Sequence, residues 1–253
     1  MSRLAPTLVL SLLCLTACGA PVSNATATVE PTAPSPAPTE PVVPREVTRA
    51  DIPADIHEDS WARLPTVARE SLPPEDQRVF DLIVNPDSSY ADGLRGPVGM
   101  WMYSPRMVEH IFPARDYLRF GTDGERDKRL AELAIIATAR ELDSQYEWSA
   151  HEPAARREGL EEEIIELVRT GRSLPETLPG LGDRERAIIR VARELVNEPR
   201  LSRDAFETAQ RLFGNEGVMD LTGLIGYYTF VNYTLKTFDV QRAPGSLLLL
   251  PLP

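Results

Sequence analysis

Glu147 and His151 are side chains of the kinds that exchange protons, and they stand four positions apart. On a helix this spacing places both side chains on one face, one turn apart. Glu132 lies shortly before them as the only charged residue in the apolar run Leu130–Ala139, where a carboxylate must be paired or neutralised. We therefore expect these three groups and the phenol of Tyr146 to form a centre for proton transfer near neutral pH.

The same side chains allow two other interpretations. Glu132 could pair with Arg129 or with His151 in a purely structural network that fixes two neighbouring helices. Glu132, Glu147 and His151 are also of the types that bind zinc or iron. No second histidine lies nearby in the sequence, so we expect no metal site.

The elements that must position these residues read as helices. Helical spacing and capping residues place Glu132 on a helix over 125–142 and His151 on the next helix, over 144–157, joined by a short turn. No stretch alternates like a strand. We expect one all-α domain of about seven or eight helices and no sheet. Its other helices are expected over 73–84, 104–120, 161–170, 183–197, 202–213 and 216–238, and a loop is expected over 85–103.

The N-terminus resembles a bacterial export signal. Arg3 is followed by the apolar run Leu8–Leu15, which is too short to span a bilayer. Leu15–Cys18 resembles a lipobox, whose cysteine becomes the lipidated first residue of the mature protein; the alternative is an ordinary signal peptide with a chance cysteine. We predict a signal peptide over 1–17, a Pro-rich tether over 18–50 that carries the lipid on Cys18, and a helical domain over 51–253.

Cysteine content and charge restrict the function classes. The only cysteines are Cys14 and Cys18, so the helical domain contains neither a disulfide nor a catalytic thiol. A net charge of −11 disfavours nucleic acid as a partner. We expect the protein at the cell envelope. Gly19, where an Asp would favour the inner membrane, indicates the periplasmic face of the outer membrane in a Gram-negative host. In other hosts we expect the outer face of the cell membrane.

The C-terminal segment Ser246–Pro253 is apolar although the protein is acidic. A free apolar segment would be an exposed patch. It could lie across helices of its own chain, or in a groove on a second subunit.

The residues of the candidate centre resemble a known family. In the peroxidase branch of the carboxymuconolactone decarboxylase family, which includes the alkylhydroperoxidase D-like proteins, Glu is followed after eleven residues by Cys. Two residues further comes a second Cys, and three residues further a His. Glu132, Ser144, Glu147 and His151 keep this spacing, with both cysteines replaced, and the resemblance extends over residues 94–240. It implies an alkylhydroperoxidase D-like multi-helix bundle, a cysteine-free branch of the family, and a homo-oligomer.

The replaced cysteines exclude thiol peroxidase chemistry, because Ser144 and Glu147 can neither attack a peroxide nor resolve the product. The resemblance implies lactone decarboxylation instead, in which a carboxyl group leaves as CO2 and a dienolate is protonated, without metal or organic cofactor. We expect His151 to donate the proton, Glu147 to orient the imidazole and raise its pKa, and Tyr146 to hydrogen-bond the anionic intermediate. Glu132 would act as base or proton reservoir if burial raises its pKa.

Arg95 stands in a Gly-rich loop and could meet a substrate carboxylate, or only fix its own loop. The other candidates for substrate contact are Ser144, Trp148 and Tyr227. His57 and His110 are not expected to donate protons. The sequence thus indicates a cofactor-free lyase for a small carboxylated or lactone compound, with a non-catalytic ligand-binding or scaffold lipoprotein as the alternative.

Overall fold

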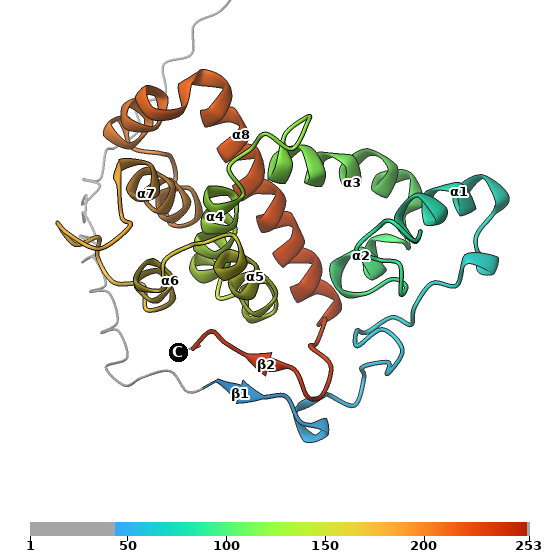
Figure 1. Cartoon of the computed structure of the whole chain (residues 1–253). Coiled ribbons are helices and arrows are strands. Elements are labelled where there is room, and N and C mark those ends of the chain that lie inside the picture. The colour runs from blue at the N-terminus through green and yellow to red at the C-terminus, as the bar shows by residue number, and fades with distance from the viewer. Residues whose placement is uncertain (1–43, 252–253) are drawn as a thin grey trace, which may run out of the picture. The chain divides into compact units, whose positions relative to one another are not determined.

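The computed structural model describes residues 44–251 of the chain, so the predicted signal peptide, most of the tether, and Cys14 and Cys18 lie outside the described residues. Within that range the chain folds as a bundle of α-helices with one additional pair of two-residue strands (Figure 1). This confirms the predicted all-α class. The helices are α1 (Pro74–Ile83), α2 (Gly96–Trp101), α3 (Pro105–Phe120), α4 (Lys128–Glu141), α5 (Gln145–Arg157), α6 (Glu162–Arg169), α7 (Asp183–Asn197) and α8 (Arg203–Phe238).

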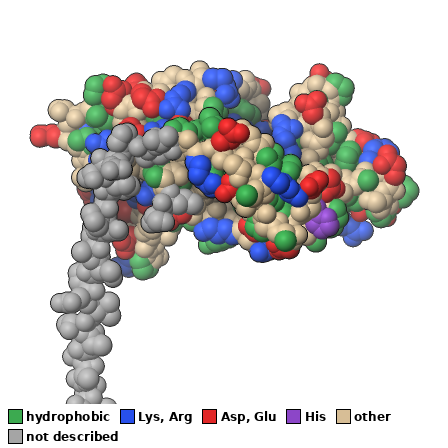
Figure 2. Space-filling model, turned by 90° about the horizontal axis from the view of Figure 1, so that it is seen from below, with side chains coloured by type: hydrophobic (Ala, Val, Ile, Leu, Met, Phe, Trp, Pro, Cys, Tyr) green, Lys and Arg blue, Asp and Glu red, His purple; other side chains and the backbone are tan. Residues whose placement is uncertain are grey.

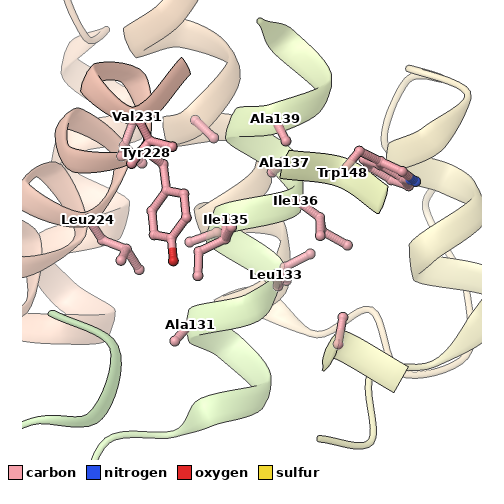
Figure 3. Packing of buried hydrophobic residues seen from close by; sticks show 14 of the residues in the cluster. Ala131, Leu133, Ile135, Ile136, Ala137, Ala139, Trp148, Leu224, Tyr228 and Val231 are labelled. Atoms are coloured by element: carbon pink, nitrogen blue, oxygen red, sulfur yellow. The ribbon is translucent and has the colours of Figure 1, made fainter. Parts of the chain in front are cut away.

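Helix α4 is the central element of the bundle. It is packed against α3, α5, α6, α7 and α8 (Figure 1). The side chain of Asp127 caps its N-terminus by accepting a hydrogen bond from the backbone N–H of Leu130 at 3.2 Å. Figure 3 shows how α8 lies on one side of α4, with Leu224, Tyr228 and Val231, while Trp148 of α5 lies on the other. The apolar run that surrounds Glu132 in the sequence is therefore buried from several sides.

A tight turn connects α4 to α5. Asp143 adopts a left-handed conformation with φ 49°, and the N–H of Ser144 donates to the carbonyl of Ala139 at 2.8 Å. Asp tolerates this conformation better than most residues. The reversal makes α4 and α5 a packed pair, as the sequence predicts, and brings Glu132 and His151 to the same region.

The expected loop over 85–103 contains a short helix, α2. Proline stands in its first turn, where its missing N–H leaves no helical hydrogen bond unmade. Three of its side chains are buried: Val98, Met100 and Trp101. The indole N–H of Trp101 donates to the hydroxyl of Thr234 on α8 at 2.7 Å. Tertiary burial thus stabilises a helix that its Gly and Pro content would not indicate.

Helix α8 is interrupted at Gly214, which has φ 71° and divides it into the two helical segments expected from the sequence. A positive φ is readily adopted by glycine and costly for other residues. The second segment carries Tyr227 and Tyr228 past α2, α3 and α4.

The C-terminal segment lies on its own chain. Strand β2 (Leu247–Leu248) pairs antiparallel with β1 (Arg45–Glu46), and the pair lies below α5 in Figure 1. The backbone N–H groups of Leu249 and Leu250 donate to Ser149 Oγ at 3.0 Å and to Gln145 Oε1 at 2.9 Å, both on α5. Leu250 is buried.

This arrangement corrects two expectations. Residues 45–50, which we assigned to the tether, are part of the fold: Arg45–Glu46 form β1, and the backbone of Val47 exchanges hydrogen bonds with Gly245 and Ser246. The expectation of no sheet misses this pair, because two residues are too short for strand alternation to be visible in a sequence.

The surface mixes both signs of charge. In the face shown in Figure 2, acidic and basic side chains are interspersed rather than gathered into one large patch. None of the helices in the described part of the chain combines the length and the apolar character that a membrane span requires.

Candidate functional site

Four side chains from α3, α4 and α5 form a continuous chain of polar contacts. Arg119 Nη2 donates to Glu132 Oε1 at 2.6 Å, and Glu132 Oε2 lies 2.7 Å from His151 Nδ1. On the other side of the imidazole, His151 Nε2 lies 3.5 Å from Glu147 Oε2, at the outer limit of hydrogen bonding. The structure therefore brings together the three groups that the sequence singles out, and adds an arginine.

Glu132 is held as a carboxylate. Burial raises its pKa, but the hydrogen bond and charge of His151 and the contact with Arg119 outweigh this effect, so the pKa lies below its ordinary value. From the sequence, burial could have raised the pKa of Glu132, and the structure gives the opposite direction. The basic partner also differs from the one considered there, since Arg129 pairs with Glu161 and Glu185 instead.

The pKa of Glu147 is shifted in the opposite direction, upward. Burial raises its pKa, and the opposing charges of His151, Arg119 and Arg242 do not compensate for the lost hydration. Its carboxyl group is 6% exposed and has no hydrogen bond from residues 44–251 closer than the 3.5 Å approach of His151. We expected Glu147 to orient the imidazole. The shorter contact assigns that position to Glu132, and Glu147 is the group that favours its protonated form.

A pocket of about 170 Å³ opens beside Glu147 and His151. An engineered cavity of about 150 Å³ holds one benzene molecule, so this pocket fits a compound of roughly one ring. Its walls come from the loop before α2, from α2 and α3, and from α5 and α8. The lining residues are Tyr90, Arg95, Pro97, Val98, Trp101, Arg115, Arg119, Tyr146, Glu147, Ala150, His151, Tyr227, Tyr228 and Val231.

One wall of the pocket is cationic. The guanidinium groups of Arg95 and Arg115 lie 4.9 Å and 5.9 Å from the centre of the Tyr90 ring. Stacking on an aromatic face leaves the N–H edges of an arginine available for a carboxylate. Arg95 also donates to the carbonyls of Ser89 and Gly93, so it fixes its own loop in addition to lining the pocket.

Two tyrosines of α8 form the opposite wall. The ring of Tyr228 meets the imidazole of His151 edge-on, with 5.1 Å between ring centres. The hydroxyl of Tyr227 is buried, and it has no hydrogen-bond partner within the described part of the chain. A buried hydroxyl without a partner is costly.

Tyr146 lies against the start of α2. Gly96 has φ 60°, and a Cβ atom at this position would stand 2.5 Å from Tyr146 Oη. Burial raises the pKa of Tyr146 to about 12, so its phenol remains a neutral hydrogen-bond donor at physiological pH.

Two predicted contact residues do not line the pocket. Trp148 is fully buried on the other side of α5, where its indole N–H donates to Glu152. Ser144 is buried at the residue before α5. The family spacing marked Ser144, and the aromatic type marked Trp148. Neither feature shows which side of the helix faces the ligand.

Arg119, Arg115 and Tyr90 line the pocket, but they were not predicted as site residues. The apolar surroundings of Glu132 in the sequence indicated that it needs a partner. Arg119 stands 13 positions earlier on another helix, and no spacing pattern links the two residues. His57 and His110 are exposed and lie outside the pocket.

The chain of contacts leaves little room for metal coordination. Within residues 44–251 no cluster of His, Cys, Asp and Glu has an arrangement that could hold a metal ion. Both oxygens of Glu132 and one nitrogen of His151 already have partners in the protein.

The helices that carry these residues are similar to a described family. Residues 105–194 match the Carboxymuconolactone decarboxylase family. The matched stretch runs from α3 into α7 and contains Arg119, Glu132, Glu147 and His151, so the comparison supports the carboxymuconolactone decarboxylase assignment for the part of the chain that holds the site.

One solved structure supports the same fold, and a second is more distantly similar. The alkylhydroperoxidase AhpD core of an uncharacterized peroxidase-related protein from Ralstonia eutropha JMP134 has a TM-score of 0.55 and 16% identity. It covers 71% of this chain and 91% of its own. A protein of unknown function from Agrobacterium tumefaciens has a TM-score of 0.47 and 20% identity, over 62% of this chain and 99% of its own. At these identities the likeness concerns the fold alone. No curated protein matches the sequence.

Proposed function

We propose that this protein is a cofactor-free acid–base enzyme of the carboxymuconolactone decarboxylase type, acting on a small carboxylated or lactone compound. The observation that carries the proposal is the chain Arg119–Glu132–His151–Glu147, which ends at the pocket beside Glu147 and His151. Titratable groups whose environments separate their pKa values are typical of acid–base sites.

The two carboxyl groups suit different steps. Ionised Glu132 accepts the Nδ1–H of His151 and fixes the ring so that Nε2 faces Glu147, as a buried aspartate orients the histidine of a catalytic triad. Glu147, whose pKa is raised by burial, is then the proposed proton donor beside the pocket. This arrangement revises our expectation that His151 donates directly.

The proposed reaction is balanced without a redox partner. The C–C bond to a substrate carboxylate breaks and CO2 leaves, while the electron pair of that bond moves through the unsaturated system to the lactone carbonyl oxygen. The resulting dienolate takes a proton on carbon from Glu147, and the neutral Tyr146 hydroxyl can hydrogen-bond its oxygen. Glu147 regains a proton from water through His151.

Substrate recognition would use the cationic wall. Arg95 and Arg115, stacked on Tyr90, present N–H groups to an anionic substituent, and the pocket is partly screened from water. The solved structures that this chain resembles include one described as peroxidase-related. A thiol peroxidase mechanism is not proposed, because the chain has no cysteine beyond Cys18.

The test is turnover of a panel of unsaturated lactone acids in D2O, followed by mass spectrometry of CO2 loss and deuterium uptake. We expect Glu147→Gln and His151→Ala to lower kcat by about 100-fold or more, as loss of a general acid does. The matched control is His110→Ala, because His110 is exposed and lies outside the pocket.

Two results would contradict the proposal. If turnover is found and survives Glu147→Gln and His151→Ala, these residues do not carry it. If lactone acids raise the melting temperature but no compound is turned over, the protein is a ligand-binding module.

We also propose that Cys18 carries a lipid that anchors the protein at the cell envelope, on the basis of its lipobox-like surroundings. Metabolic labelling with a fatty acid should mark the wild type and the Cys14→Ser variant, whose cysteine precedes the predicted cleavage site. Labelling that persists in Cys18→Ser would refute the anchor.

A further inference from the structure

A second pocket, of about 240 Å³, lies where α4, α7 and α8 meet. None of its lining residues belongs to the pocket beside His151. Most of its wall is aliphatic or aromatic, and charged groups stand among these apolar side chains. The lining residues are Arg126, Asp127, Leu130, Ala131, Ala134, Arg184, Ile188, Leu212, Phe213, Gly217, Asp220, Leu221 and Leu224.

The break in α8 builds this pocket. Gly214 separates the segment that contributes Leu212 and Phe213 from the segment that contributes Leu221. Gly217 has no side chain where a Cβ atom would stand 2.7 Å from Phe213 Cβ. The two glycines therefore let the segments of α8 form two walls of one hollow, which an uninterrupted helix would not do.

The charged groups of the pocket leave N–H donors in excess. Arg126 Nη2 pairs with Asp220 at 2.8 Å, and Asp127 is occupied as the cap of α4. Arg126 Nε is buried and shielded from the pocket. Arg184 stacks on Phe213 at 5.5 Å and makes no ion pair with any residue that the structure describes.

We propose that this pocket binds a small amphipathic carboxylate, of the class of medium-chain fatty acids. The apolar wall accepts the chain, and the carboxylate supplies the acceptor that the exposed guanidinium of Arg184 lacks. A cavity of about 150 Å³ holds benzene, so 240 Å³ has room for a chain of about eight carbons. The proposal does not depend on the chemistry at His151.

The test is calorimetric titration of the full chain with octanoate and, separately, with octanol. We expect saturable binding of octanoate, and binding about tenfold weaker in Arg184→Gln, which loses one charged contact. Octanol, which lacks the carboxylate, should bind weakly and equally to both proteins. Arg106→Gln is the matched control, because Arg106 is an exposed arginine outside the pocket.

Two further variants locate the binding. Ala134→Phe should fill the cavity and abolish binding; if it does not fold, the exposed Arg184→Gln variant decides. His151→Ala should bind octanoate normally, because His151 lies in the other pocket. The proposal is overturned if octanoate does not bind, if Arg184→Gln binds it as tightly as Arg106→Gln does, or if His151→Ala abolishes binding. It is also overturned if octanoate is bound only by a self-associated form of the chain in which the pocket is covered.

Discussion

Two glutamates on either side of one imidazole acquire opposite properties from their neighbours. Glu132 contacts Arg119 and His151 and has a lowered pKa, whereas Glu147 is buried with only a long contact and has a raised pKa. The same functional group is therefore prepared once as a fixed anion and once as an acid. The difference comes first from the short contact of Glu132 with His151 and then from its hydrogen bond with Arg119 of α3, because Glu147 has neither.

Glu147 should cost the protein stability at neutral pH. Its pKa in the folded state lies above its ordinary value of 4.5. Its contribution to stability is therefore complete below the pKa of the unfolded chain and is lost as the pH rises through the folded-state pKa. Glu147→Gln removes this loss, so we expect a gain of about 0.5–2 kcal/mol at pH 8, or about 2–4 °C in melting temperature per kcal/mol.

Calorimetric melting from pH 4 to pH 8 checks this prediction. The advantage of Glu147→Gln should disappear near pH 4, where the wild-type carboxyl is protonated in both states. A variant that melts below the wild type at pH 8 would show that Glu147 is ionised and stabilising in the folded protein.

Arg119 should be essential for the same network. Its side chain and that of Glu132 are 14% and 5% exposed, so Arg119→Met leaves a buried carboxylate without its main cation. We expect a loss of about 3–5 kcal/mol at pH 7, measured by urea unfolding, and partial recovery in Arg119→Met/Glu132→Gln.

Because the pKa of Glu132 is lowered in the wild type, the stability it provides is lost as the pH falls through that pKa. The difference between wild type and Arg119→Met should therefore shrink below about pH 4. Equal damage in the double variant would contradict this account.

The sequence predicted the composition of the site better than its geometry. Helical spacing placed Glu147 and His151 on one face, and the isolation of Glu132 indicated that it needed a partner. Which cation would pair with it depended on how α3 crosses α4, and residue spacing carries no information on that crossing. The directions of the pKa shifts of Glu132 and Glu147 could not be predicted for the same reason, because they depend on which cations lie beside each carboxylate.

At the scale of elements, α2 controls the shape of the site through a glycine. Gly96→Ala would place a methyl group 2.5 Å from Tyr146 Oη in a residue with φ 60°. Backbone strain and overpacking together should cost about 1–3 kcal/mol. The proposed turnover should fall as well, because Tyr146 lines the pocket.

Gly96→Ala/Tyr146→Phe isolates the clash, because it removes the hydroxyl that the methyl group meets. Thermal unfolding should show part of the loss restored in the double variant, with the backbone strain remaining. A double variant that sums the two single losses would place the damage elsewhere.

Element positions were predictable where composition and burial agree. The helices of the hairpin, α3, and the division of α8 near Gly214 followed from capping residues and apolar spacing. Helix α2 did not, because glycine and proline indicate a loop while contacts with Trp101 and Thr234 stabilise a helix. In the β1–β2 pair, Arg45 lies opposite Leu248 and Glu46 lies opposite Leu247. These partners are about 200 positions apart along the chain, and no local pattern reveals such a contact.

At the scale of the whole molecule, the C-terminal segment contacts α5, the helix that carries Glu147 and His151. Cutting the chain after Gly245 removes β2, the buried Leu250 and two hydrogen bonds to α5. Burial of one leucine contributes about 2 kcal/mol and each hydrogen bond about 1 kcal/mol, so we expect a loss of about 2–4 kcal/mol.

Thermal melting and sedimentation together test this expectation. The melting temperature should fall, while the sedimentation coefficient should keep the oligomeric state of the uncut chain. A truncated chain that loses self-association would show that the segment also reaches a second subunit, which was the other interpretation of its apolar sequence.

The pairing of β1 with β2 has a topological consequence. Because Arg45 lies opposite Leu248, the two ends of the described chain are neighbours (Figure 1). A short linker could join them, and new termini could be opened in the exposed turn near Arg172, between α6 and α7. Such a circular permutant would keep residues 90–151 unbroken, although α7 and α8 would then be made first.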